Sequence, residues 1–320
     1  MSLTIHCTRN GLVETVHPVS AVLIEGGAVR WSVGEDIASF WRSASKPFQL
    51  LNSLNCLPDT LVDSLDERAL AIGTASHSGQ PEHTDAVASL LTRFDLGAGQ
   101  LQCGTHPPSH EATARTVPVP TVLHNNCSGK HTFMLAACAA QGWQRDYRPP
   151  DHPLQARNHA LLDDLAGMHH GVGVDGCSVP TFHTSLSGQA RAWAAIAEAM
   201  AGRGDPRLGR IGWAMQREPF LVSGTHRLDL AVCQASEAPI ACKIGAEGLF
   251  CIASPSGYQG LAVKVHTGNT EALAVAVRAV LAKVGLPLRG PWFWDTVRNV
   301  RNAEVGERRA VWGIATPPSS

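Results

Sequence analysis

The chain has 320 residues, with 26 Lys and Arg against 27 Asp and Glu and a formal net charge of -1. This length allows one large or two small domains, and the balanced charge leaves no basic surface for nucleic acid and no polybasic segment for a membrane. We therefore expect a small-molecule partner. The N-terminal residues lack a basic segment followed by an apolar run, and no apolar stretch approaches the ~20 residues that cross a bilayer, which predicts a cytoplasmic protein.

The first third of the chain has the pattern of an antiparallel β meander. Turn signals such as Asn10-Gly11 and Gly26-Gly27 separate β-type segments at 3–7, 12–16, 21–25 and 29–32. The pattern then changes, and it predicts a helix over 45–55, a buried strand over 69–75 and an amphipathic helix over 81–94.

Helices dominate the middle of the chain. We predict them over 130–141, 154–165 and 187–201, and Trp193, Ile196 and Met200 fall at helical spacing in the last of these, which is typical of core residues. Further along, the sequence predicts strands over 228–234, 239–244, 249–253 and 261–266 and then a helix over 271–284.

This order of elements predicts an α+β fold, with an antiparallel sheet built from N- and C-terminal strands, flanking helices and a mainly helical middle. We expect residues 1–75 and 220–320 to form the sheet-containing part and residues 76–219 the helical part of one catalytic unit. Only the Pro- and Ser-rich end, 316–320, has the composition of a disordered segment.

Ser43 and Lys46 form the first motif that carries chemistry, in the segment RSASKP at a predicted helix start. The (i, i+3) spacing places both side chains on one face. A neutral lysine can take the proton of a serine nucleophile if its pKa falls towards ~7–8, and a helix N-terminus disfavours the cation. A capping serine followed by a surface lysine explains the same letters.

Two further motifs follow predicted strands. Ser76 lies in TASHSG, where polar residues at the end of a buried strand are typical of reactive groups, although a capping loop is the simpler interpretation. Lys243 lies in KIGAEG on a predicted edge strand, where an ammonium can reach a serine, as in the K-T-G element of serine β-lactamases. A hairpin turn with a solvated lysine is equally compatible.

Cysteines mark the last two motifs. The nine cysteines of the chain, an odd number without close periodic spacing, favour thiols, some of them on a metal, over a disulfide framework. Cys127 precedes a predicted helix in HNNCSGKH, which favours a low-pKa thiol that is a nucleophile or a metal ligand. Cys177 lies in VDGCSVP, but two sulfurs alone do not make a zinc site.

In this order and spacing the motifs RSASKPFQ, ASHSG, CGTHPP, NNCSGKH, VDGCSVP and KIGAEG resemble the L-asparaginase II family, the rhizobial-type asparaginases. The resemblance implies a fold similar to serine β-lactamases and glutaminases and assembly as a homodimer. It also implies two serine–lysine pairs, Ser43 with Lys46 and Ser76 with Lys243. A zinc ion held by two cysteines and a lysine is implied as well; the matching positions are Cys127, Lys130 and Cys177.

The resulting hypothesis is an L-asparaginase that releases aspartate and ammonia through an acyl-enzyme on an activated serine, with Ser43 preferred to Ser76 as the nucleophile. The zwitterionic substrate needs a cation, Arg42 or His131, and an acceptor, Asp175. His226 departs from the family pattern, where a small residue is expected, so its role stays open.

Two alternatives compete with this hypothesis, and a third function is disfavoured. One extra methylene is worth only ~1–3 kcal/mol in a pocket, so a glutaminase or another serine amidohydrolase or peptidase remains an alternative. A zinc-dependent binding protein without catalysis is a second. The absence of an S-D-N element and the presence of Ile244 in the K-T-G counterpart disfavour β-lactam hydrolysis.

Overall fold

A computed structural model describes residues 1–313 of the protein, so the predicted disordered end lies outside the described residues. Its main sheet is antiparallel, with the order β10-β11-β1-β2-β9-β8-β7 and β3 paired to β2. The strands are β1 (Ser2–Arg9), β2 (Leu12–Glu25), β3 (Ala28–Val33), β7 (Ala241–Ile244), β8 (Leu249–Ser254), β9 (Gln259–Val265), β10 (Thr296–Arg298) and β11 (Glu304–Gly313).

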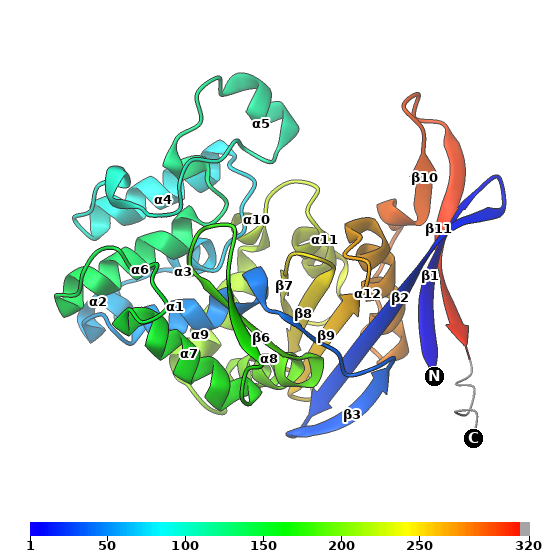
Figure 1. Ribbon diagram of the computed structural model, residues 1–320, viewed down its shortest axis with the longest axis horizontal. Coiled ribbons are helices and arrows are strands. Elements are labelled where there is room, and N and C mark those ends of the chain that lie inside the picture. The colour runs from blue at the N-terminus through cyan, green and yellow to red at the C-terminus, as the bar shows by residue number, and fades with distance from the viewer. Residues whose placement is uncertain (314–320) are drawn as a thin grey trace.

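Helices make up most of the rest of the molecule, and Figure 1 shows most of them gathered beside the sheet, away from β1 and β11. They are α1 (Lys46–Leu54), α2 (Asp59–Asp63), α3 (Glu67–Gly73), α4 (Pro81–Arg93), α5 (Glu111–Thr116), α6 (Ser128–Gln141), α7 (Pro153–Ala166), α8 (Leu186–Met200), α9 (Pro206–Arg217), α10 (Pro219–Val222), α11 (Leu228–Ala235) and α12 (Thr270–Lys283). Short 3-10 turns are η1 (Arg42–Ser45), η2 (Ala98–Gln100), η3 (Val122–His124) and η4 (Phe293–Asp295). A small second sheet has the order β4-β6-β5, from β4 (Ala38–Phe40), β5 (Gly171–Val174) and β6 (Pro180–Ser185).

Both faces of the main sheet are buried along its middle strands, and the second half of β2 shows how. Successive side chains of a strand point to opposite faces. Ala21 and Leu23 belong to the core that also contains the apolar side of α12, whereas Val22 and Ile24 belong to the core shared with the helices of the middle region. The sheet thus separates two hydrophobic cores, and β7 lies at the edge nearest the middle helices.

The α+β class with a sheet built from both ends of the chain is confirmed. The predicted helices over 130–141, 154–165 and 187–201 correspond to α6, α7 and α8, and the core placement of Trp193 is confirmed by its complete burial. The segments 12–16 and 21–25 form one continuous strand, β2, and β10 and β11 were not predicted. The division into a sheet-containing and a helical part stays a prediction.

Two predicted strands are wrong. Residues 69–75 lie mainly in helix α3, because Asp66 caps its first turn by accepting a hydrogen bond from the amide of Ala69. Residues 228–234 lie in helix α11. Both segments are short apolar runs, which periodicity alone cannot assign to a helix or a strand.

None of the helices within residues 1–313 combines the length and the apolar character that a membrane crossing requires.

Candidate active site

Ser43 and Lys46 stand where a 3-10 turn runs into a helix. Turn η1 covers Arg42–Ser45, and Lys46 is the first residue of α1. Ser43 is half-buried, whereas the side chain of Lys46 is completely buried. The predicted helix start is therefore confirmed, and the amine of Lys46 points into the protein, where it needs hydrogen-bond acceptors.

Lys46 finds its acceptors on the segment that carries the second predicted serine. Its Nζ donates hydrogen bonds to the carbonyl oxygen of Ala75, at 2.6 Å, and to Oγ of Ser76, at 2.8 Å. The serine–lysine contact in the described residues thus joins Lys46 to Ser76, which lies 30 positions further along the chain.

Two neighbouring segments hold Ser76 and His77 in place. Its amide donates to the carbonyl of Val222, and the amide of His77 donates to the carbonyl of Asn126. The His77 ring accepts from the amide of Gly79 through Nδ1, which leaves Nε2 to donate to Oγ of Ser128 at 2.9 Å. Burial lowers the pKa of His77 well below its ordinary value, so the neutral ring ties the two motif loops together.

Gly129 explains how these loops come so close. A Cβ at Gly129 would lie 2.0 Å from the carbonyl oxygen of Ile72, so the start of α6 and the end of α3 touch through their backbones. Any side chain at residue 129 would push α6 away from the segment that carries Ser76.

Lys243 is the second buried lysine, and its partner is a carboxylate. Its Nζ lies 3.5 Å from Oδ1 of Asp229 and donates to the carbonyl of Ile244 at 3.2 Å. Asp229 is itself fixed by the amide of Ile244, at 2.7 Å. Burial lowers the pKa of Lys243 to about 8; Asp229 opposes this shift, while the charges of Lys46 and Arg227 add to it.

No motif indicates Asp229, since the sequence predicts a strand over 228–234 where the structure has helix α11. In helix α11 its side chain reaches the end of β7, and its second oxygen, Oδ2, has no hydrogen-bond partner among the described residues. The resemblance pairs Ser76 with Lys243. In the structure, Ser76 instead accepts a hydrogen bond from Lys46, and Lys243 forms an ion pair with Asp229.

A cavity of about 280 Å³ brings both serines together. Its walls also contain the polar side chains of Asn126, His226 and Arg227. The lining residues are Ser43, Ser76, Asn126, His226, Arg227, Leu228, Ile244, Gly245, Ala246, Thr270 and Trp294. The segment that carries His226 thus forms part of the wall. Its neighbour Arg227 is a site residue that no motif indicates.

The three predicted substrate-binding residues lie elsewhere among the described residues. Arg42 Nε donates to Oδ1 of Asp175 at 2.6 Å, so these two opposite charges satisfy each other. His131 is completely buried against Tyr147, and burial lowers its pKa well below the ordinary value. None of the three lines the cavity that contains Ser43 and Ser76.

The predicted metal ligands converge at the start of α6. Cys127 caps the helix, Lys130 lies in its first turn, and Cys177 comes from the loop between β5 and β6. All three are buried, and Lys130 Nζ lies 3.1 Å from Sγ of Cys177.

The two thiols of this cluster differ in their pKa shifts. The neighbouring Cys127 and the charge of Lys130 lower the pKa of Cys177 to about 5, against the effect of burial. The neighbouring Cys177, together with burial, raises the pKa of Cys127 far above its ordinary value. This shift of the Cys127 pKa is opposite in direction to the low-pKa thiol that the sequence predicts at this position.

These donors fit a zinc ion. Two sulfurs and one amine nitrogen meet in a buried place, and tetrahedral zinc prefers sulfur and nitrogen ligands at ~2.0–2.3 Å, which puts neighbouring donors roughly 3.5 Å apart. Cys127, Lys130 and Cys177 can hold such an ion if the amine and both thiols lose their protons.

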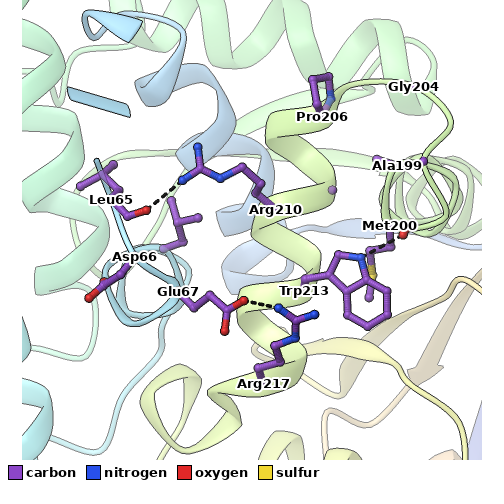
Figure 2. Close-up of a pocket in the computed structure, with 13 residues that line it drawn as sticks. Leu65, Asp66, Glu67, Ala199, Met200, Gly204, Pro206, Arg210, Trp213 and Arg217 are labelled. Carbon is purple, nitrogen blue, oxygen red and sulfur yellow. Dashed lines mark hydrogen bonds and ion pairs between the residues drawn. The ribbon is translucent and has the colours of Figure 1, made fainter. Parts of the chain in front are cut away.

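A larger cavity, of about 560 Å³, lies between α3 and α9. Figure 2 shows three of its polar side chains engaged with neighbours: Arg217 with Glu67, Arg210 with the carbonyl of Leu65, and Trp213 with the carbonyl of Met200. No residue singled out from the motifs lines it, so its size does not make it the reactive site.

Two serine hydroxyls thus lie on one cavity, and the buried amine of Lys46 donates a hydrogen bond to one of them. The chain belongs to the L-asparaginase II family, whose model matches residues 5–310. It is therefore an amidohydrolase of the L-asparaginase type. No curated protein matches its sequence.

Solved structures show distant likenesses. The native form of Mglu is 15% identical with a TM-score of 0.47, over 85% of this chain and 66% of that one. A β-lactamase candidate from Bacteroides dorei is 13% identical with a TM-score of 0.46, over 84% and 93%. A β-lactamase from Mycobacterium bovis is 10% identical with a TM-score of 0.43, over 83% and 94%. Likenesses at this level carry no argument about substrate or mechanism.

Proposed function

We propose that this enzyme hydrolyses L-asparagine through a serine ester, with Ser43 as the nucleophile, Lys46 as its base and Ser76 as the proton donor to the leaving group. The observation that carries this mechanism is the hydrogen bond between Lys46 and Ser76 at a cavity that also contains Ser43. Membership of the L-asparaginase II family supplies the reaction.

The hydrogen bonds of Lys46 support Ser43 as the group whose proton Lys46 accepts. A neutral amine has two N–H bonds and one lone pair. The carbonyl of Ala75 can only accept, and Ser76 accepts the second N–H, so the lone pair is left for a third group. Ser43 lies three residues before Lys46 and lines the same cavity as Ser76, and catalytic contacts often tighten only when substrate binds.

Each proton transfer in the reaction then has a donor and an acceptor. Ser43 Oγ attacks the amide carbon of the asparagine side chain while Lys46 Nζ takes its proton. Lys46 returns a proton to Oγ of Ser76, whose own proton moves to the departing nitrogen, and the C–N bond breaks to give ammonia and an aspartyl ester. Water attacks the ester in the reverse sequence and releases aspartate. The backbone amides of Ser43 and Ala246, both on the cavity, are the simplest donors to the oxyanion.

Arg227 is the group we propose for the α-carboxylate of the substrate. It lines the cavity, whereas Arg42 is engaged with Asp175. The side-chain oxygen of Asn126, on the same cavity, can accept from the α-ammonium.

We also propose zinc at Cys127, Lys130 and Cys177. When bound, the ion supplies a positive charge that orients substrate and links the two loops. Without it, the chain's own hydrogen bond between Lys130 and Cys177 joins the same loops.

The test is ammonia release from L-asparagine by wild type, Ser43→Ala and Ser76→Ala, with L-glutamine beside it. We expect Ser43→Ala to lose at least about 10³-fold in kcat and Ser76→Ala to lose less, since proton transfer contributes ~10²–10⁴-fold. Equal rates on the two amides would favour a general glutaminase–asparaginase, and no release from either would sink the enzyme assignment and favour a zinc-dependent binding protein.

Ser76 is the second candidate nucleophile, because it is the serine whose hydroxyl already contacts Lys46. Complete loss in Ser76→Ala with activity retained in Ser43→Ala would assign the attack to Ser76.

A homodimer in the cytoplasm completes the proposal. The family resemblance supports the dimer, and light scattering of the purified protein measures it: a monomer mass would contradict this part of the proposal.

A further inference from the structure

A cluster of three metal-ligating side chains lies outside the catalytic cavity, at the C-terminal end of α7. His159 and Asp163 are one helical turn apart on α7, and His169 comes from the segment between α7 and β5. Their donor atoms all lie within 4.8 Å of one another. We propose that His159, Asp163 and His169 bind a second divalent cation of the zinc type, separate from the cysteine–lysine cluster.

The distances match those of a coordination sphere. His159 Nε2 lies 2.7 Å from Nδ1 of His169 and 3.3 Å from Oδ2 of Asp163, and His169 Nδ1 lies 3.0 Å from Oδ1 of Asp163. A tetrahedral site with bonds of ~2.0–2.1 Å has donor-to-donor edges of about 3.3 Å. The three separations, 2.7–3.3 Å, lie at or below this edge, and the two contacts to Asp163 use different oxygens. Small side-chain shifts therefore let the three residues share one cation and leave one position for water.

Hydrogen bonds alone satisfy this arrangement less well than a cation does. A proton on Nδ1 of His169 can lie along the edge to Asp163 or along the edge to His159, but it cannot serve both. A cation receives a lone pair from each of the three groups at once. Imidazole and carboxylate are ligands that suit zinc and its neighbours in the first transition row.

Neighbouring groups hold the ligands in this orientation. The ring of Phe182, a buried residue of β6, stacks on His159 with a centroid distance of 5.1 Å and an interplanar angle of 11°. The backbone amide of His169 donates to Oδ1 of Asp163 at 3.1 Å, which fixes the carboxylate. Gly167 ends α7 with φ of 85°, and this left-handed turn brings His169 back to the helix. Such support of first ligands is typical of metal sites.

The side chains are accessible enough for a cation to enter. Their exposed fractions are 35% for His159, 32% for Asp163 and 20% for His169. The hairpin of β5 and β6 begins beside this cluster, where Gly171 pairs with His183, and its far end leads to Cys177. A bound ion would fasten α7 to the base of the hairpin that presents Cys177.

The experiment uses the full chain, stripped with a chelator and dialysed against Zn²⁺, with bound metal counted by mass spectrometry. Wild type, His169→Ala and Asp163→Asn are compared, and Asp163→Asn guards against a folding defect because it keeps the shape of the side chain. The control is His170→Ala, which removes an exposed neighbouring imidazole and leaves all three ligands. Cys177→Ser identifies the separate sulfur site.

We expect His169→Ala and Asp163→Asn to bind one ion fewer than wild type, or to bind it at least tenfold more weakly, while His170→Ala is unchanged. Asparagine hydrolysis by His169→Ala should stay close to the wild-type rate. If wild type binds one ion that His169→Ala loses and Cys177→Ser keeps, the second site stands and the sulfur site falls. Equal zinc content and affinity in wild type, His169→Ala and Asp163→Asn would overturn the proposal.

Discussion

The start of α1 and the end of β7 each bury a lysine completely, yet they satisfy the two amines in different ways. Lys46 faces a carbonyl and a hydroxyl at a cavity, whereas Lys243 faces the carboxylate of Asp229. An amine beside neutral acceptors can exchange protons with a serine. An amine beside a fixed carboxylate contributes to the local electrostatic field instead. The two buried lysines therefore have different roles.

The largest effect should come from the lysine at the cavity. Lys46→Met removes the proposed base, and we expect kcat on asparagine to fall about 10³-fold, within the ~10²–10⁴-fold range of general base catalysis. The control is Lys283→Met, at an exposed lysine of α12, which should keep the wild-type rate. Equal activity of Lys46→Met and Lys283→Met would contradict the role of Lys46 as the base.

Proton linkage sharpens the description of Lys243. Its pKa is lowered in the folded protein from 10.5 to about 8, so between these values the unfolded chain binds more protons than the folded one. The free energy of unfolding should therefore increase as pH rises from about 8 to about 10.5. The contribution of this group is on the order of 3 kcal/mol in total.

Urea unfolding of wild type and Lys243→Met at pH 7.5 and pH 10 measures this gain. The variant lacks the titrating amine, so the difference between the two proteins should grow in favour of wild type at the higher pH. A difference independent of pH would show that Lys243 keeps its ordinary pKa.

The contact between Lys46 and Ser76 depends on the close approach of α3 and α6. Gly129→Ala inserts a methyl group against the carbonyl of Ile72, and we expect it to cost about 1–3 kcal/mol of unfolding free energy and to lower kcat. Gly99→Ala is the control, because nothing lies within 4 Å of a Cβ there. Equal unfolding midpoints in the two variants would contradict the close packing.

The smallest effect should come from Arg227, which lines the cavity. Arg227→Gln removes the proposed cation for the substrate carboxylate, and we expect KM to rise about tenfold with little change in kcat, as for one charge-assisted hydrogen bond of ~1.5 kcal/mol. Its charge also lowers the pKa of Lys243, so the variant should raise that pKa. A lower kcat with unchanged KM would instead assign Arg227 to the transition state.

Much of the site was accessible from local patterns. The helix start at Lys46 and the strands and helices with clear periodicity could be predicted, because their signals lie within a few residues. The family motifs identified both serines and both lysines, and the structure places Ser43 and Ser76 on one cavity.

The pairings could not be predicted, because they join residues that are distant in the chain. Lys46 meets Ser76 across 30 positions, and Arg42 meets Asp175 across 133. Asp229 was missed because a short apolar helix has the same composition as a buried strand, and only the helix turns its carboxylate towards Lys243.

The central claim is that Ser43 carries the acyl group, and the most direct measurement is to locate that group. Wild-type enzyme turning over L-asparagine is quenched with acid, digested and mapped by mass spectrometry. The mechanism predicts an aspartyl ester on the peptide that contains Ser43. An ester on the Ser76 peptide, or ammonia release with no ester on either serine, would contradict it.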